Sequence, residues 1–273
     1  MVHYIIWILA AILYFPVFSM LYRHGWKSSD YTHAYFIPPI FFWLVWRKRT
    51  VLREVIQKIK PGNNFFGLFI LLLGISMFVF GYRQDYGFIT TLSLLPVLYG
   101  LTSYLYGLHV TKVISFPILY LILLVPIPTG IIDNFTLPLR YSLSIAAESI
   151  LTLFHFPITR EGLLLSIGKS ELFMGQPCSG FRSMVTMFSL SLVYVYISKG
   201  SLSKKSILVA SVIPLALMGN LIRIITLCLI TYYFGEEAGQ GFFHNFSGIV
   251  IFVFIILGLI GLEYFLENKM SAK

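Results

Sequence analysis

Charged residues are scarce in this sequence, and no polar stretch is long enough to form a separate soluble domain. Only 11% of the 273 residues are charged, 58% are hydrophobic, and the mean hydropathy is +0.84. A soluble domain carries about 25% charged residues. The composition therefore excludes a water-soluble globular protein and predicts a chain whose main solvent is the lipid bilayer.

Several other features are also missing. The two cysteines, Cys178 and Cys228, do not predict a structural disulfide, and Cys228 lies in an apolar run typical of a small buried side chain. There is no HExxH motif and no Cys/His ligand spacing, so we expect no metal or cofactor. The net charge of +9 comes from short Lys/Arg runs beside apolar segments, which encode membrane topology, so we expect no nucleic-acid partner.

What is present is a series of apolar segments. We predict an all-α polytopic membrane protein of about eight transmembrane helices, with residues 1–273 as a single transmembrane domain. The first segment lacks a basic start and a small-residue cleavage site, so we interpret it as an uncleaved span. The predicted spans are Tyr4–Tyr22, Ala34–Trp46, Phe65–Phe80, Phe88–Leu108, Val113–Ile127, Ser179–Ser198, Ser206–Phe234 and Phe246–Leu266.

The loops predict an orientation. Loops on the side of the N-terminus carry about twice as many Lys and Arg residues as the others, which places both termini in the cytoplasm. The largest outside region then runs from Pro128 to Gln176. Within it, Asn134–Phe156 predicts an interfacial helix at the outer face, and Ile158–Gly175 predicts a short β-hairpin of two strands around a Gly-Lys-Ser turn.

Four residues with reactive or charged side chains fall at one membrane level. Arg182 and Arg223 lie inside predicted spans, where an Arg at the bilayer centre costs about 2.5–3.5 kcal/mol. A rise of about 1.5 Å per residue places both near the outer boundary, together with Cys178 and His244. Depth alone does not bring these residues side by side.

These residue types suit covalent acyl transfer. A thiol at a helix N-terminus beside a cation has a lowered pKa and attacks as the thiolate. An imidazole can move the proton, and a guanidinium can stabilise an oxyanion. Each residue also fits an ordinary structural role: a cysteine in packing, a loop histidine in solvent, or an arginine at a headgroup.

Four short motifs resemble, in order, those of the exosortase and archaeosortase family of membrane transpeptidases. The resemblance covers roughly Trp26 to Gly248. It implies a bacterial type, because His244 stands where archaeal members carry arginine. The motifs are DYTH at 30–33, PCSGFRS at 177–183, NLIR at 220–223 and HNFSG at 244–248.

The resemblance also implies roles for these residues. Cys178 would be the nucleophile, Arg223 the oxyanion or substrate-orienting cation, and His244 the acid/base. Arg182, Asn220 and Ser179 would support them, and Asp30 and His33 would be structural or substrate-positioning residues.

The implied function is a cysteine transpeptidase of the bacterial inner membrane, with its active site at the extracytoplasmic face. Its partners would be membrane lipids and exported proteins with a C-terminal sorting tail, of the type with a short motif, an apolar helix and a basic end. The acceptor amine is open, and hydrolysis shares the same acyl-enzyme. Two other functions stay open: a secondary transporter or flippase, which the missing internal repeat disfavours, and a membrane assembly factor without chemistry.

Overall fold

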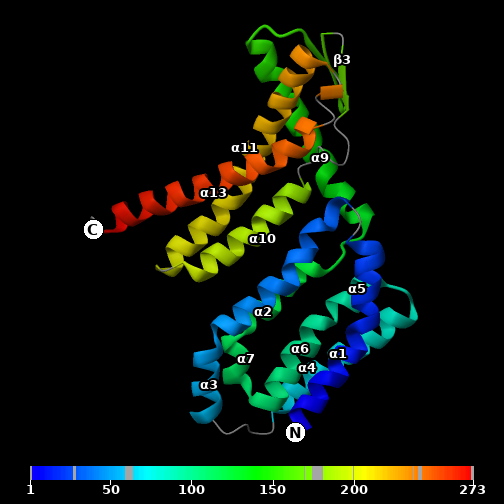
Figure 1. Cartoon of the computed structure of the whole chain (residues 1–273), viewed down its shortest axis with the longest axis vertical. Coiled ribbons are helices and arrows are strands. Elements are labelled where there is room, and N and C mark those ends of the chain that lie inside the picture. Colours follow the sequence, from blue (N-terminus) through cyan, green and yellow to red (C-terminus); the bar gives the residue numbers. More distant parts are fainter. Residues whose placement is uncertain are drawn as a thin grey trace. The chain divides into compact units, whose positions relative to one another are not determined.

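The computed structural model of the chain describes residues 2–26, 29–58, 64–168, 170–173, 181–198, 200–235, 237–238 and 242–271. Within these ranges the description omits the side chains at 2, 24–25, 29–32, 129, 131–132, 135, 181–184, 202, 242–252 and 269–271. The chain forms two compact units, Met1–Pro128 and Thr129–Lys273, and each is described by itself (Figure 1).

The first unit is helical throughout its described part. Its long helices are α1, α4 and the α5–α6 pair, and shorter helical pieces connect them. The elements are α1 (Val2–Met20), η1 (Leu21–Gly25), η2 (Ser29–Phe36), α2 (Ile37–Arg47), α3 (Arg49–Lys58), α4 (Phe65–Arg83), α5 (Gly87–Leu92), α6 (Leu94–Tyr106), α7 (Leu108–Val113), α8 (Ser115–Tyr120) and η3 (Leu121–Leu124).

Glycines allow α4 and α6 to pack backbone to backbone. A Cβ at Gly74 would lie 2.7 Å from the backbone nitrogen of Val97, and one at Gly100 would collide with the backbone of Leu71. Small residues at such contacts are how helices approach closely in lipid, where no hydrophobic effect drives them together. Glycine is therefore required at these two contact positions.

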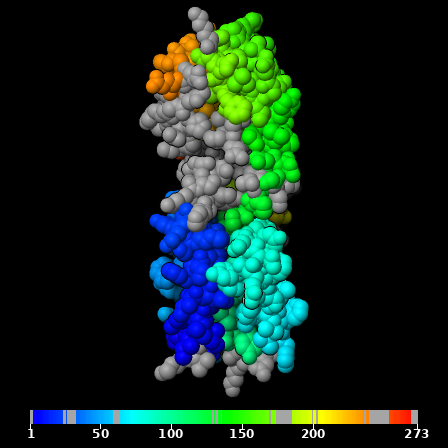
Figure 2. All heavy atoms as spheres, turned by 90° about the vertical axis from the view of Figure 1, so that its right-hand side faces the viewer, coloured from blue at the N-terminus to red at the C-terminus, as the bar shows by residue number. Residues whose placement is uncertain are grey.

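Helix α1 lies against α4 and the start of α6. Figure 2 shows α1 (blue) beside the cyan α4–α5 segment on one face of this unit. The Tyr14 and Phe78 rings meet edge to face at 5.1 Å, and the Tyr14 hydroxyl shares a 2.7 Å hydrogen bond with Ser93 Oγ. This bond satisfies the Tyr14 hydroxyl, because a polar group buried between helices needs a hydrogen-bond partner.

The second unit combines four long helices with a small sheet. It contains α9 (Thr129–Leu153), β1 (Ile158–Glu161), β2 (Leu164–Ile167), β3 (Ser170–Phe173), α10 (Phe181–Ile197), α11 (Leu202–Phe234) and α13 (Phe242–Ser271). The strands form an antiparallel meander in the order β1-β2-β3, in which Glu161 pairs with Leu164 and Ile167 pairs with Ser170.

The sheet adds one strand to the predicted hairpin. The turn at Gly168, where φ is +62°, joins β2 to β3 as predicted. A second tight turn at Gly162, also with φ +62°, adds β1, which the two-strand prediction missed. Glycine supplies the left-handed backbone conformation at both turns without steric cost. Arg160 on β1 ties the sheet to α9 through a 2.8 Å ion pair with Glu148.

Helix α11 contributes to two hydrophobic clusters among the described residues of the second unit. Its C-terminal half packs against α9 and the sheet, where Leu151, Leu165 and Leu227 are almost completely buried. Its N-terminal half packs between α10 and α13, where Val212 contacts the same cluster as Met187 and Ile255. One continuous helix therefore connects the sheet to the helix trio.

Four helices of the described part are long and apolar enough to cross a membrane: His3–Arg23, Phe65–Arg83, Gly87–Tyr106 and Ser203–Phe234. They coincide with four of the eight predicted spans. The second predicted span contains the end of η2 and most of α2 (Ile37–Arg47), and α2 alone rises about 17 Å, less than a hydrocarbon core of about 30 Å. The other predicted spans, and the orientation, stay predictions.

Candidate active site

Helices α10, α11 and α13 are held together by a charged cluster at one end. Lys204 Nζ on α11 lies 2.7 Å from Glu263 Oε1 and 2.6 Å from Glu267 Oε1, both on α13. From the end of α10, Ser198 Oγ donates to Glu263 at 2.5 Å, and the Tyr194 hydroxyl donates to the same carboxylate. These bonds bring the start of α11 and the ends of α10 and α13 to one level. Distances along the three helices can be counted from this level.

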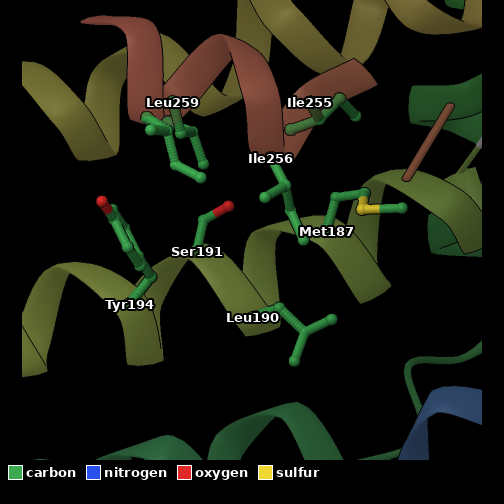
Figure 3. A pocket seen from close by; sticks show the side chains of 8 residues that line it. Met187, Leu190, Ser191, Tyr194, Ile255, Ile256 and Leu259 are labelled. Atoms are coloured by element: carbon green, nitrogen blue, oxygen red, sulfur yellow. The ribbon is translucent and has the colours of Figure 1, made fainter. Parts of the chain in front are cut away.

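Further along, the same three helices pack through apolar side chains. In Figure 3, Met187, Ser191 and Tyr194 of α10 face Ile255, Ile256 and Leu259 of α13, and Leu190 points away from them. The space between the two helices is small, about 70 Å³. Helices α10 and α13 are therefore in direct contact over this stretch, so their relative register is fixed.

This register places the predicted site residues of the three helices, Arg182, Arg223 and His244, toward the end opposite the charged cluster. Arg223 lies nineteen residues after Lys204, and His244 lies nineteen residues before Glu263. At about 1.5 Å per residue, each backbone position is about 28 Å along its helix from the cluster. Arg182, in the first turn of α10, lies twelve residues before Tyr194, or about 18 Å along.

Arg223 and Asn220 lie on one buried face of α11. Their side chains are 7% and 1% exposed, and Ile224, Leu227 and Cys228 continue the same face. The predicted burial of Cys228 is confirmed, at 0% exposed. Taking a guanidinium out of water costs several kcal/mol unless charges or hydrogen bonds compensate. Arg223 is thus held inside the protein and is not a surface anchor.

The remaining predicted site residues are placed less completely. Cys178 and Ser179 lie outside the described residues. For Arg182, His244 and Asp30 the helical backbone is described, but not the side chains. His33 belongs to the first unit, on η2, and its side chain is 4% exposed. The structure therefore brings Asn220 and Arg223 together on α11 and gives no side-chain contact for the predicted thiol or imidazole.

The structure also identifies a buried cation, Arg140, within the segment that the sequence analysis predicted as an interfacial helix. Arg140 on α9 is 6% exposed, and its guanidinium lies 3.4 Å from Asp133 Oδ1 and 3.2 Å from Thr136 Oγ1. Leu143, one turn further along α9, packs in the same cluster as Ile224 of α11. Helices α9 and α11, which carry Arg140 and Arg223, therefore pack against each other. The spacing of the helical partners of Arg140, seven and four residues earlier, is the signal that could have found it.

No metal-binding arrangement is found in the described part of the chain, where no three His, Cys, Asp or Glu side chains lie close enough to hold an ion. The chemistry that the described residues favour is charge stabilisation by buried guanidinium groups. Such groups, fixed before the reaction begins, can stabilise a developing oxyanion in a low-dielectric site.

A comparison with protein families gives a clear result. The family model described as transmembrane exosortase matches residues 26–261. Among curated proteins and among solved structures, none matches the chain. The matched range includes all four motifs of the sequence analysis and most of both units. The chain therefore belongs to the transmembrane exosortase family.

Proposed function

We propose that this chain is a membrane cysteine transpeptidase that removes the C-terminal sorting tail of exported proteins through a thioacyl-enzyme at Cys178. The observation that carries the proposal is the exosortase family match over residues 26–261, which includes the predicted nucleophile, arginine and histidine motifs. The burial of Arg223 in the second unit supports it, because a buried guanidinium is suited to an oxyanion.

The proposed reaction proceeds in two halves. The Cys178 thiolate attacks the scissile carbonyl, and Arg223 stabilises the negative oxygen of the tetrahedral intermediate. The C–N bond then breaks, His244 protonates the leaving amine, and a thioester remains. An acceptor amine attacks the thioester, gives its proton to His244 and releases the thiolate. Water in place of the amine gives hydrolysis by the same route.

The substrate chemistry follows from the membrane. A sorting tail with a short motif, an apolar helix and a basic end holds its basic end in the cytoplasm by the positive-inside rule. The motif then lies at the extracytoplasmic face of the inner membrane. Arg223 and His244 each lie about 28 Å along their helices from the charged cluster. This length is close to the thickness of a hydrocarbon core, about 30 Å.

Among the described residues, the charged side chains give the transporter alternative no support. A transporter is expected to pair charges near the middle of the bilayer. The Lys204–Glu263 pair instead joins the start of α11 to the last turns of α13. Such a position is typical of an ion pair that fastens helix ends together, so we do not propose transport.

The test is co-expression of a tailed substrate with Cys178 variants. Cys178→Ser and Cys178→Ala should leave the tail in place, measured as the intact mass of the substrate. The matched control is Cys228→Ala, which removes the chain's other thiol from a site that is 0% exposed and should still process. Tail removal that persists in both Cys178 variants would refute the proposed nucleophile.

The same experiment separates transfer from hydrolysis. A processed substrate whose C-terminus carries added mass indicates an acceptor amine, whereas a free carboxylate indicates water. Either product requires the thioester. A Cys178 adduct of substrate mass that hydroxylamine removes is therefore expected in both cases.

A further inference from the structure

The first unit contains a large apolar cavity. Its volume is about 610 Å³, and it lies between α1, α2, α6 and the α8–η3 segment. This volume is within the range of about 300–1,000 Å³ found for small-molecule sites. Aromatic and aliphatic side chains such as Phe18, Phe41 and Val97 form most of its wall.

Each polar side chain of the cavity lining makes a hydrogen bond within the protein. The polar side chains of its lining are Trp7, Tyr14, Thr102 and Tyr106. Trp7 Nε1 donates to the Tyr106 hydroxyl at 3.2 Å, and Tyr14 shares its hydrogen bond with Ser93. The Thr102 hydroxyl donates to a backbone carbonyl one turn earlier at 2.7 Å. Because each of these side chains already makes a hydrogen bond within the protein and the rest of the lining is apolar, the cavity suits a hydrocarbon.

The length and volume select the kind of hydrocarbon. Along α1 the lining runs from Trp7 to Phe18, a rise of about 17 Å, close to half of a bilayer core of about 30 Å. A spanning helix about 10 Å wide and about 30 Å long would fill about 2,400 Å³. That is several times the cavity volume, so a whole transmembrane helix is too large to be enclosed, whereas an acyl chain that spans one leaflet matches the length of the lining.

The cavity is open toward the lipid side. Phe15 and Phe42 belong to its lining, yet they are 72% and 68% exposed. Both lie on helices of the apolar first unit, α1 and α2. A chain can therefore enter laterally from the bilayer without any opening of the protein.

A basic stripe lies at one end of the cavity. On α3, the lining residues Leu52 and Ile56 alternate with Arg49 and Arg53 at i, i+3, i+4 and i+7, which places all four on one helical face. Both arginines are exposed, and the Arg49 guanidinium lies 3.9 Å from the Trp46 ring centre. Arginine beside tryptophan is typical of the membrane interface, where anionic headgroups lie.

We propose that this cavity binds one acyl chain of an anionic phospholipid, with the lipid phosphate held by Arg49 and Arg53. The site lies in the first unit and does not depend on the proposed reaction. The basic stripe selects the headgroup, the apolar lining selects the chain, and the exposed phenylalanines provide the entrance. A basic protein tail would be repelled by the same stripe, which argues against the substrate as occupant.

The test is lipid retention by the full-length protein. The protein is reconstituted in nanodiscs of equal parts phosphatidylglycerol and phosphatidylethanolamine, extracted in detergent, washed, and analysed by native mass spectrometry. We expect one retained phosphatidylglycerol per chain. Replacing Arg49 and Arg53 by glutamine should lower the preference over phosphatidylethanolamine about five-fold for each charge removed. The matched control is Lys58→Gln on the opposite face of α3, which should retain the preference.

A second pair of variants tests the chain pocket. Ala10→Trp fills the cavity from α1 and should abolish retention of the lipid. Ile12→Trp adds the same ring at a position on α1 that is 62% exposed and outside the lining, so retention should persist. Equal retention in Ala10→Trp and Ile12→Trp overturns the site, and so does equal lipid preference in the arginine and Lys58 variants.

Discussion

At the scale of single residues, Arg223 is a charged side chain in a buried position. Its side chain is 7% exposed, next to Asn220 at 1%, on a helix otherwise rich in leucine and isoleucine. An arginine presents a planar fork of donors that lysine cannot reproduce. The family membership and the burial together favour a role in holding a negatively charged oxygen.

Arg223→Lys should therefore lower tail removal by about 10²–10³-fold, the usual effect of losing an oxyanion donor, although the positive charge is kept. The measurement is the rate of substrate processing with purified enzyme. Arg83→Lys on the exposed end of α4 is the matched control and should process normally. Normal processing by Arg223→Lys would reduce Arg223 to a packing role.

At the scale of elements, one ion-pair cluster determines the register of α10, α11 and α13. Lys204 is 2% exposed and contacts two carboxylates, whereas the Glu267 side chain is 60% exposed. Breaking a buried pair costs about 3–5 kcal/mol because it leaves an uncompensated charge. A pair with one exposed partner contributes about 0–1 kcal/mol.

The three substitutions in this cluster should therefore rank in a fixed order. Lys204→Met should lower the unfolding temperature most, Glu263→Gln less, and Glu267→Gln least, as measured by thermal unfolding in detergent. Glu263 is the central residue because it also accepts from Ser198 and Tyr194. If Glu267→Gln were the most damaging, the exposed carboxylate and not the buried one would be holding the helices together.

A second element-scale prediction concerns the backbone contact between α4 and α6. Gly100→Ala should destabilise the first unit, because the added methyl group collides with Leu71 and forces the helices apart. Gly261→Ala on α13 is the control, since nothing lies within 4 Å of the place that its added methyl group would take, and helix propensity favours alanine by about 1 kcal/mol. Equal unfolding temperatures for the two variants would show that the helices can separate freely.

Local patterns predicted local structure, and contacts between distant segments were not predictable. Apolar runs located the long helices, and the Gly-Lys-Ser turn located β2 and β3. The separate strand β1 was missed because a single glycine, Gly162, marks its turn, so the residues on both sides of it were assigned to one strand. The pairing of Lys204 with Glu263 across about sixty residues has no local signal in the sequence.

The candidate site was predictable only in part, for the same reason. Helical rise put Arg223 and His244 at similar distances along their helices because that quantity depends on residue number alone. Their lateral arrangement depends on packing. Arg140 shows the difference: the spacing to its partners Asp133 and Thr136 can be read from the sequence, whereas its burial also depends on how α9 packs.

At the scale of the whole molecule, the family membership and the apolar helices support a multi-pass membrane protein. The direction in which the helices cross decides whether the proposed thiol faces the exported substrate. An even number of spans with basic inner loops predicts both termini inside and Cys178 outside. The buried Cys228 makes this testable, because a site that is 0% exposed gives little background reaction.

A membrane-impermeant maleimide should therefore label the wild-type protein in intact spheroplasts and should not label Cys178→Ser. The reason is that the predicted topology leaves Cys178 as the one reactive thiol and places it in the outer solvent. The companion protein carries Lys58→Cys with both native cysteines replaced, so that its thiol lies in a predicted cytoplasmic loop and reacts only after rupture. Labelling of Cys178 only after rupture would reverse the orientation. It would also separate the thiol from any substrate motif held at the outer face, so the proposed reaction would fail together with the topology.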